Sequence, residues 1–246
     1  MTATPDPDRL GGLAWTRRTG GALTPRERRR LLGAVARAQA RYVLDRVRLL
    51  TGHVPPVALD LEDLRPPDSA LARAAEEACR EQSPALVGHS HRTWAFGAGL
   101  AAVDGAPVDP EHLYVAALLH DHGLDAPVAG EDFTLRSADR AAALGAPDAV
   151  GDAITSHSTP GATWGTDGVG AYVGAGAVLD LGGLRASDLP RAYRDGAIVL
   201  HPRDGLIASV SQLVRAEAAL NPRGRFALLR RCGILPLMAI TPLKPR

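Results

Sequence analysis

The chain has 246 residues, 46% of them hydrophobic, which is enough for one domain with a sizeable core. Its formal net charge of +1 excludes a strong overall field for nucleic acid or an anionic membrane. Two cysteines exclude a disulfide framework, and no apolar run reaches the length of a membrane span or a signal peptide. We therefore expect a cytoplasmic protein without nucleic-acid or membrane partners, and the Ala-, Gly- and Arg-rich composition is typical of a GC-rich bacterial gene.

Helical patterns dominate the chain after an N-terminal extension, residues 1–23. Thr24 and Pro25 begin the first helix, because threonine caps it, proline suits the first turn, and Glu27 completes a capping box. Residues 57–68 are acidic and contain proline, and are typical of a connector. Apolar spacing and Gly or Pro boundaries predict helices over about 25–51, 70–82, 84–103, 110–121, 135–144, 147–157, 168–181 and 203–220.

No stretch of strand length alternates between apolar and polar residues, and no internal repeat is present. We therefore predict an all-α fold, with a single helical domain over residues 24–246. An enzyme of this class and size is compatible with a homo-oligomer.

The pair His120-Asp121 follows an apolar helical run, residues 113–119. Burying an imidazole and a carboxylate together is costly unless a positive partner satisfies both, and a metal ion does so. His89 on an upstream helix and Asp180 on a downstream helix offer two further ligands, which suits a site between the helices of a bundle. Zinc, iron and manganese all accept such ligands. Each residue alone has an ordinary structural explanation, but together they predict a metal site.

The sequence around these residues resembles the HD metal-dependent hydrolase superfamily, and within it the cyanamide hydratase-like branch. The likeness extends over about residues 85–246, and its blocks are His89-Ser90-His91-Arg92-Thr93, Pro110-Glu111-His112-Leu113-Tyr114-Val115-Ala116-Ala117-Leu118-Leu119-His120-Asp121 and the small-residue run Gly176-Ala177-Val178-Leu179-Asp180.

The resemblance implies a single HD-domain helical bundle with a zinc- or iron-type site at His89, His120, Asp121 and Asp180. It also implies a reaction in which metal-bound water attacks a small C–N substrate that is nitrile-like, an amide or an amidine. The chain departs from the branch at His122, where an aliphatic residue is usual. At position 134, threonine follows phenylalanine where glutamate is usual. Both departures lie near the predicted site and indicate a substrate other than cyanamide.

Three residues besides Asp121 are candidates for catalytic roles. His157 stands where several HD proteins have another active-site histidine, although a helix C-terminus also favours histidine through its dipole. Asp125 either orients a ligand histidine or caps the turn before Pro127. Arg92 either balances the acidic ligands, holds an anionic part of the substrate, or pairs with a surface carboxylate.

Two other functions stay open. A phosphohydrolase acting on nucleotides would use Arg92, Arg136 and Arg140 to contact phosphate. A di-iron oxygenase would need two added histidines, and beyond His122 only His157 is available. A motif kept without catalytic activity is the non-enzymatic alternative.

Overall fold

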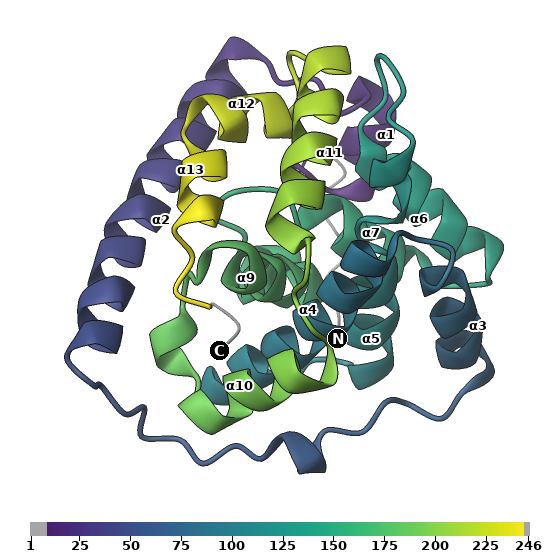
Figure 1. Cartoon of the computed structure of the whole chain (residues 1–246). Helices are drawn as coiled ribbons and strands as arrows, with labels where there is room; N and C mark the ends of the chain where they lie inside the picture. Colours follow the sequence, from purple (N-terminus) through teal and green to yellow (C-terminus); the bar gives the residue numbers. More distant parts are fainter. Residues whose placement is uncertain (1–8, 244–246) are drawn as a thin grey trace.

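The computed structural model describes residues 9–243, which form thirteen α-helices and three short 3-10 helices (Figure 1). The α-helices are α1 (Leu13–Thr19), α2 (Pro25–Leu50), α3 (Ala70–Cys79), α4 (Pro84–Val103), α5 (Pro110–Leu119), α6 (Phe133–Ala143), α7 (Asp148–Ser156), α8 (Trp164–Asp167), α9 (Val169–Gly182), α10 (Arg191–Leu200), α11 (Leu206–Leu220), α12 (Arg225–Arg231) and α13 (Ile234–Ala239). The 3-10 helices are η1 (Leu61–Asp63), η2 (His122–Asp125) and η3 (Ala186–Asp188). The described residues contain no strand, so the predicted all-α fold is confirmed.

The eight helices predicted from the sequence are all present, and their ends agree within a few residues. Local signals explain this agreement, since Pro25, Pro84 and Pro110 each occupy the first turn of a helix. Five helices were not predicted, namely α1, α8, α10, α12 and α13. Most of them are short, and short helices depend on tertiary packing more than on their own pattern.

Helices α4 and α9 pack against each other in the centre of the molecule (Figure 1). Two glycines permit the close approach. A Cβ atom at Gly97 would meet the carbonyl oxygen of Tyr172, and one at Gly176 would overlap the carbonyl oxygen of Thr93. The small-residue run of α9 therefore brings its backbone against α4, the helix that carries His89.

Helix α2 forms an outer wall of the molecule and runs along the left edge of Figure 1. It begins with the predicted capping box, in which Thr24 accepts from the backbone of Glu27 and the Glu27 side chain accepts from the backbone of Thr24. Its inward face buries Leu31, Ala34 and Tyr42, among others. A long connection with only η1 inside it then passes along the lower edge of the view to α3.

Residues 9–23 pack against the rest of the fold. Leu13 of α1 belongs to the main core, and Trp15 packs in a smaller cluster with Leu31 of α2. The indole nitrogen of Trp15 also donates to Glu27 Oε1 at 2.8 Å. The division of the chain at residues 23 and 24 stays a prediction.

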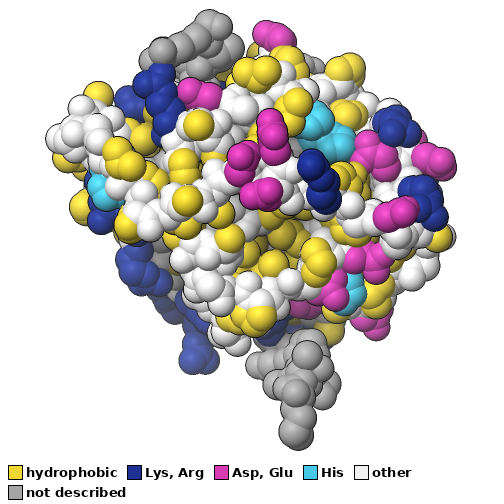
Figure 2. Space-filling view, turned by 90° about the horizontal axis from the view of Figure 1, so that it is seen from below, with side chains coloured by type: hydrophobic (Ala, Val, Ile, Leu, Met, Phe, Trp, Pro, Cys, Tyr) yellow, Lys and Arg dark blue, Asp and Glu magenta, His cyan; other side chains and the backbone are white. Residues whose placement is uncertain are grey.

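The face in Figure 2 carries acidic, basic and hydrophobic side chains interspersed, without one sign of charge prevailing across it.

No helix within residues 9–243 combines the length and the apolar character needed to cross a bilayer.

Candidate metal centre

Four polar side chains meet in the interior, and we call them the His–Asp cluster: His89, His120, Asp121 and His157. His89 lies within α4, whereas His120 and Asp121 follow the last residue of α5, and His157 follows the last residue of α7. None of the four is more than 7% exposed. The fold therefore brings together the predicted ligand pair, the upstream histidine and the histidine with an open role.

A hydrogen bond at Nδ1 orients each imidazole of the cluster. The Nδ1 atoms of His120 and His157 each lie within 2.8 Å of a carbonyl oxygen three residues earlier in the chain. Because a carbonyl oxygen only accepts, Nδ1 carries the proton in both rings and Nε2 keeps its lone pair. His89 Nδ1 lies 2.7 Å from Asp180 Oδ2, which orients the third ring in the same way.

Asp121 lies among the Nε2 atoms of all three histidines. Its Oδ2 atom is 3.4 Å from Nε2 of His120 and 3.7 Å from Nε2 of His89. Its Oδ1 atom is 3.7 Å from Nε2 of His157 and has no hydrogen-bond partner. The Nε2 atoms of His89 and His120 are 3.4 Å apart. Buried acceptor atoms thus face one another with no donor between them.

A divalent metal ion fits this arrangement. Zinc binds imidazole nitrogen at about 2.0–2.1 Å in tetrahedral geometry, which separates neighbouring ligand atoms by about 3.3 Å. The separations of 3.4–3.7 Å within the cluster are close to that value. His89, His120 and Asp121 offer ligand atoms that all lie within 4.8 Å of one another. A cation would satisfy the unpaired carboxylate oxygen and the facing lone pairs together.

The protonation states agree with a cation site. Burial lowers the pKa of His120 and, with the nearby His120, lowers the pKa of His157 to about 3. Burial alone would raise the pKa of Asp121, but the surrounding histidines outweigh it and hold that pKa below its usual range. At neutral pH the cluster therefore contains neutral His120 and His157 beside an ionised carboxylate.

Asp180 lies behind His89 and does not line the cavity. Its Oδ2 accepts from Arg92 Nη2 at 2.9 Å as well as facing the His89 ring, while Oδ1 accepts from Arg92 Nε at 2.8 Å and Arg203 Nε at 3.0 Å. The pKa of Asp180 is well below its usual range because His89 and Arg92 outweigh the effect of burial. Asp180, implied by the resemblance as the fourth ligand, thus contacts the cluster through His89.

Several other predicted residues lie away from the cluster. Asp125 is exposed and accepts from the backbone N–H of Ser83 at 3.3 Å. His122 lies on the surface side, 3.1 Å from Glu81. Neither residue lines the cavity described below.

The three arginines considered for phosphate binding are engaged elsewhere. Arg92 is fully buried and, besides Asp180, donates to two backbone carbonyl oxygens. Arg136 pairs with Glu131 at 3.1 Å, and Arg140 pairs with Glu81 at 2.5 Å. None of the three lines the cavity.

A cavity of about 640 Å³ reaches the His–Asp cluster, and all four cluster residues line it. The remaining walls come mainly from apolar side chains of α2, α9, α11, α12 and α13. The cluster therefore supplies the polar part of a mostly apolar enclosure.

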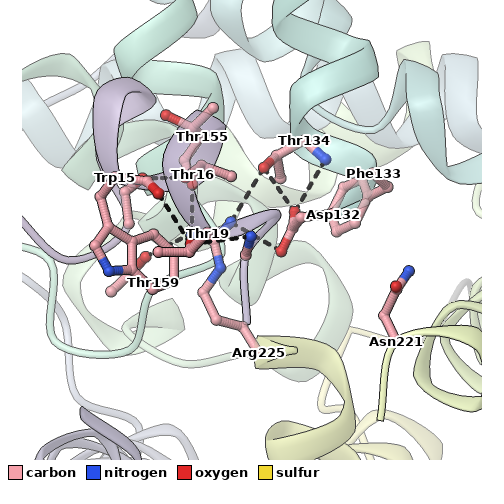
Figure 3. Close-up of polar contacts among 12 residues, drawn as sticks. Trp15, Thr16, Thr19, Asp132, Phe133, Thr134, Thr155, Thr159, Asn221 and Arg225 are labelled. Carbon is pink, nitrogen blue, oxygen red and sulfur yellow. Dashed lines mark hydrogen bonds and ion pairs between the residues drawn. The ribbon is translucent and has the colours of Figure 1, made fainter. Parts of the chain in front are cut away.

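Arg225 of α12 organises a second buried polar group, which sequence analysis did not identify (Figure 3). We call it the arginine cluster: Arg225, Asp132, Thr134, Thr155 and Thr159. Arg225 Nη1 donates to the carbonyl oxygen of Thr155 and to Thr159 Oγ1, while Nη2 donates to Thr134 Oγ1 and lies 3.1 Å from Asp132 Oδ2. Arg225 therefore contacts both ends of the segment 155–159, which carries His157. No local sequence pattern signals these contacts, because they join three distant segments.

Ser158 is a further site residue that sequence analysis missed. It follows His157, lines the cavity and is 7% exposed, yet its hydroxyl has no hydrogen-bond partner. The neighbouring Ser156 instead donates to the carbonyl oxygen of Ala153 within α7. The sequence Ser-His-Ser alone does not indicate which hydroxyl reaches the site.

Residues 86–189 match the family model of the HD domain. This segment of the chain is therefore similar to the HD domain. This segment includes all four residues of the His–Asp cluster, and the superfamily consists in general of metal-dependent hydrolases, which supports an enzyme with a divalent metal site. No curated protein matches the chain.

Proposed function

We propose that this protein is a metal-dependent hydratase or hydrolase of the HD superfamily that acts on a C–N bond of a small molecule, such as a nitrile, an amide or an amidine. One observation carries the proposal: the His–Asp cluster lies at the wall of a cavity whose other walls are mainly apolar. An uncharged substrate matches those walls better than a phosphate ester does.

His89, His120 and Asp121 would hold the ion, which is zinc or iron, with manganese as a further candidate. When bound, a divalent ion lowers the pKa of a coordinated water and polarises the substrate. Asp180 would orient His89 from behind, in the way that a carboxylate commonly supports a metal-bound histidine. Arg92 and Arg203 keep Asp180 ionised for that role.

We assign proton transfer to His157. Its Nε2 atom keeps a lone pair, faces Asp121 and lines the cavity. Hydration of a nitrile forms a C–O bond, breaks a C–N π bond and transfers protons from water to nitrogen, giving an amide. Hydrolysis of an amide also breaks the remaining C–N bond, and the nitrogen leaves as ammonia or an amine. In both reactions His157 would accept a proton from the attacking water and return it to nitrogen.

The two alternative functions have less support from the side chains at the site. A nucleotide phosphohydrolase would need unpaired buried cations in the cavity, but Arg92, Arg136 and Arg140 all lie outside it. Of the arginines that line the cavity, Arg41 and Arg185 pair with carboxylates and Arg37 is exposed. A di-iron oxygenase would need added histidines, and His122 lies on the surface beside Glu81. Of His122 and His157, only His157 belongs to the His–Asp cluster.

Metal analysis and a substrate panel test the proposal together. The purified protein should contain about one zinc or iron per chain, and should release ammonia or form amide from nitriles and amides. A chelated sample serves as control and should lose turnover until metal is restored. Phosphate release from nucleotide monophosphates, without turnover of any C–N substrate, would contradict the proposal in favour of the phosphohydrolase. Two irons per chain would favour oxygenation.

A further inference from the structure

The cavity is much larger than the reacting group alone requires. Its volume of about 640 Å³ is roughly twenty times the ≈30 Å³ that one water molecule occupies in the liquid. Cavities of about 300–1,000 Å³ usually take organic ligands of drug size. A substrate with only a few heavy atoms, such as cyanamide, would leave most of this space filled with water against apolar walls.

Those walls consist of aliphatic and aromatic side chains from several helices. They include Val35 and Tyr42 of α2, Ala175 and Val178 of α9, Phe226 of α12 and Leu237 of α13. Removing such surface from water contributes about 25 cal/mol per Å². A substrate body that covers these residues would therefore gain affinity mainly from apolar burial.

The charged side chains that line the cavity away from the His–Asp cluster are largely neutralised. Arg185 lies 2.7 Å from Asp104, and Arg41 donates to Asp188 at 2.6 Å. Arg37 is the remaining lining cation among residues 9–243, and it is exposed. These pairs leave no buried cation for a phosphate or carboxylate on the substrate body.

One polar group next to the cluster is free to bind the substrate. Ser158 lines the cavity and is more than nine-tenths buried, and its buried hydroxyl has no hydrogen-bond partner. A buried hydroxyl without a hydrogen bond is unfavourable, and a ligand with an acceptor atom at that position would satisfy it. Nitrile nitrogen and amide oxygen are both acceptors.

We infer that the cavity takes a nitrile or carboxamide whose uncharged apolar body lies between α2 and α9, while its polar end meets the His–Asp cluster and accepts a hydrogen bond from Ser158. The inference rests on the proposed function for the polar end of the molecule. Recognition of the apolar body depends only on the cavity walls.

Binding can be measured separately from turnover. The uncharged aromatic dye 1-aminoanthracene is bound to the full chain, as purified and after chelation, and displaced by straight-chain nitriles from propanenitrile to nonanenitrile. Affinity should rise about fourfold with each methylene, as burial of one CH₂ predicts, until the cavity is full. Affinity that does not change with chain length would overturn the inference.

Two alanines on α2 provide a matched pair of variants. Ala38 lines the cavity, whereas Ala40 is exposed on the outer face and does not. Ala38→Phe should weaken binding of nonanenitrile at least tenfold with little effect on propanenitrile, and Ala40→Phe should change neither. Ala175→Phe on α9 tests the opposite wall if Ala38→Phe unfolds. Unchanged binding of nonanenitrile to either folded wall variant would contradict the inference.

Ser158→Ala tests the polar end. Affinity for nonanenitrile should fall about two- to tenfold while affinity for 1-aminoanthracene stays the same. An unchanged nitrile affinity would refute the role of Ser158. Chain-length-dependent binding without metal-dependent turnover of any nitrile or amide would uphold the inference and contradict the proposed function. Metal-dependent turnover that favours the shortest substrates would uphold the proposed function and contradict the inference about the apolar body.

Discussion

Two buried polar groups share the segment 155–159, and they differ in whether their charges are balanced. In the arginine cluster, both terminal nitrogens of Arg225 donate to oxygen atoms, and one cation faces the carboxylate of Asp132. In the His–Asp cluster, the acceptor atoms of Asp121 and the histidines face one another without a donor or a cation. Burial alone therefore does not mark a functional site. A buried charge without a partner is the better sign of a functional site, because burying it is unfavourable until a cation binds there.

The largest effect is expected from Asp121→Ala, which removes the only carboxylate of the His–Asp cluster. The purified variant should contain no stoichiometric metal and show no detectable turnover of nitriles or amides, because two neutral imidazoles bind a divalent ion weakly. Metal analysis and ammonia release measure both effects. Asp125→Ala is the control, since Asp125 is exposed and lies outside the cavity. Retention of stoichiometric metal by Asp121→Ala would refute the assignment of Asp121 as a ligand.

His157→Gln separates proton transfer from metal binding. We expect kcat to fall by about 10²–10⁴-fold, the usual contribution of a general acid–base group, while the metal content stays the same. Steady-state kinetics and metal analysis on the same sample measure the two effects. His112→Gln, at the start of α5 and outside the cavity, should change neither. Loss of the metal from His157→Gln would make His157 a ligand and would favour a dinuclear site.

The arginine cluster should respond in stability rather than in metal binding. Arg225→Met leaves the Asp132 carboxylate buried without its cation, which should lower the free energy of unfolding by about 3–5 kcal/mol. Burial alone would raise the pKa of Asp132, but Arg225 and Thr134 hold it below its usual range, so the folded protein keeps a charge there. Urea unfolding of the wild type and the variant measures the difference.

An exposed ion pair serves as the control for that experiment. Arg191 and Asp195 lie 3.2 Å apart on the surface of α10, and Arg191→Met should cost less than about 1 kcal/mol. The double variant Arg225→Met with Asp132→Asn should recover part of the lost stability, because no charge is then left unpaired. Equal losses for Arg225→Met and Arg191→Met would show that the arginine cluster has no special structural role.

Asp180→Asn distinguishes a supporting carboxylate from a ligand. A carboxylate that orients a metal-bound histidine usually contributes about 10–100-fold to metal affinity, so the variant should bind metal more weakly but still bind it. Competition with a chelator of known affinity measures the change. Complete loss of metal, equal to that in Asp121→Ala, would make Asp180 a direct ligand, as the family resemblance implies.

The sequence predicts the parts of this structure that depend on short segments. Proline and capping residues mark the starts of α2, α4 and α5, and the His120-Asp121 pair marks the candidate metal site through its position at the end of an apolar helix. The position of Asp180 relative to the candidate ligands could not be predicted, because it depends on Arg92 and Arg203 from other segments. The same reason applies to Ser158 and Arg225, whose roles depend on packing between residues far apart in the chain.

The smallest effect concerns Glu217 of α11, which lies at the edge of the arginine cluster. Burial and the nearby Asp132 raise the pKa of Glu217 to about 7, against the opposing effects of Asn221 and Arg136. The folded protein therefore keeps a proton that the unfolded chain loses above its ordinary pKa near 4.5. Stability should consequently fall as the pH rises between these two values, by on the order of 2 kcal/mol.

Glu217→Gln tests this effect, because it keeps the shape of the protonated carboxyl and cannot ionise. Urea unfolding at intervals between pH 5 and pH 8 should show a smaller decline for the variant than for the wild type, with the gap largest at the alkaline end. Glu62→Gln, on the exposed helix η1, is the control and should follow the wild type. Parallel curves for the wild type and Glu217→Gln would mean that Glu217 is ionised in the folded protein at pH 5. Arg136 Nη2 lies 3.7 Å from the buried Oε2 atom of Glu217 without a hydrogen bond to it, and burial beside Asp132 outweighs that contact and favours the protonated form.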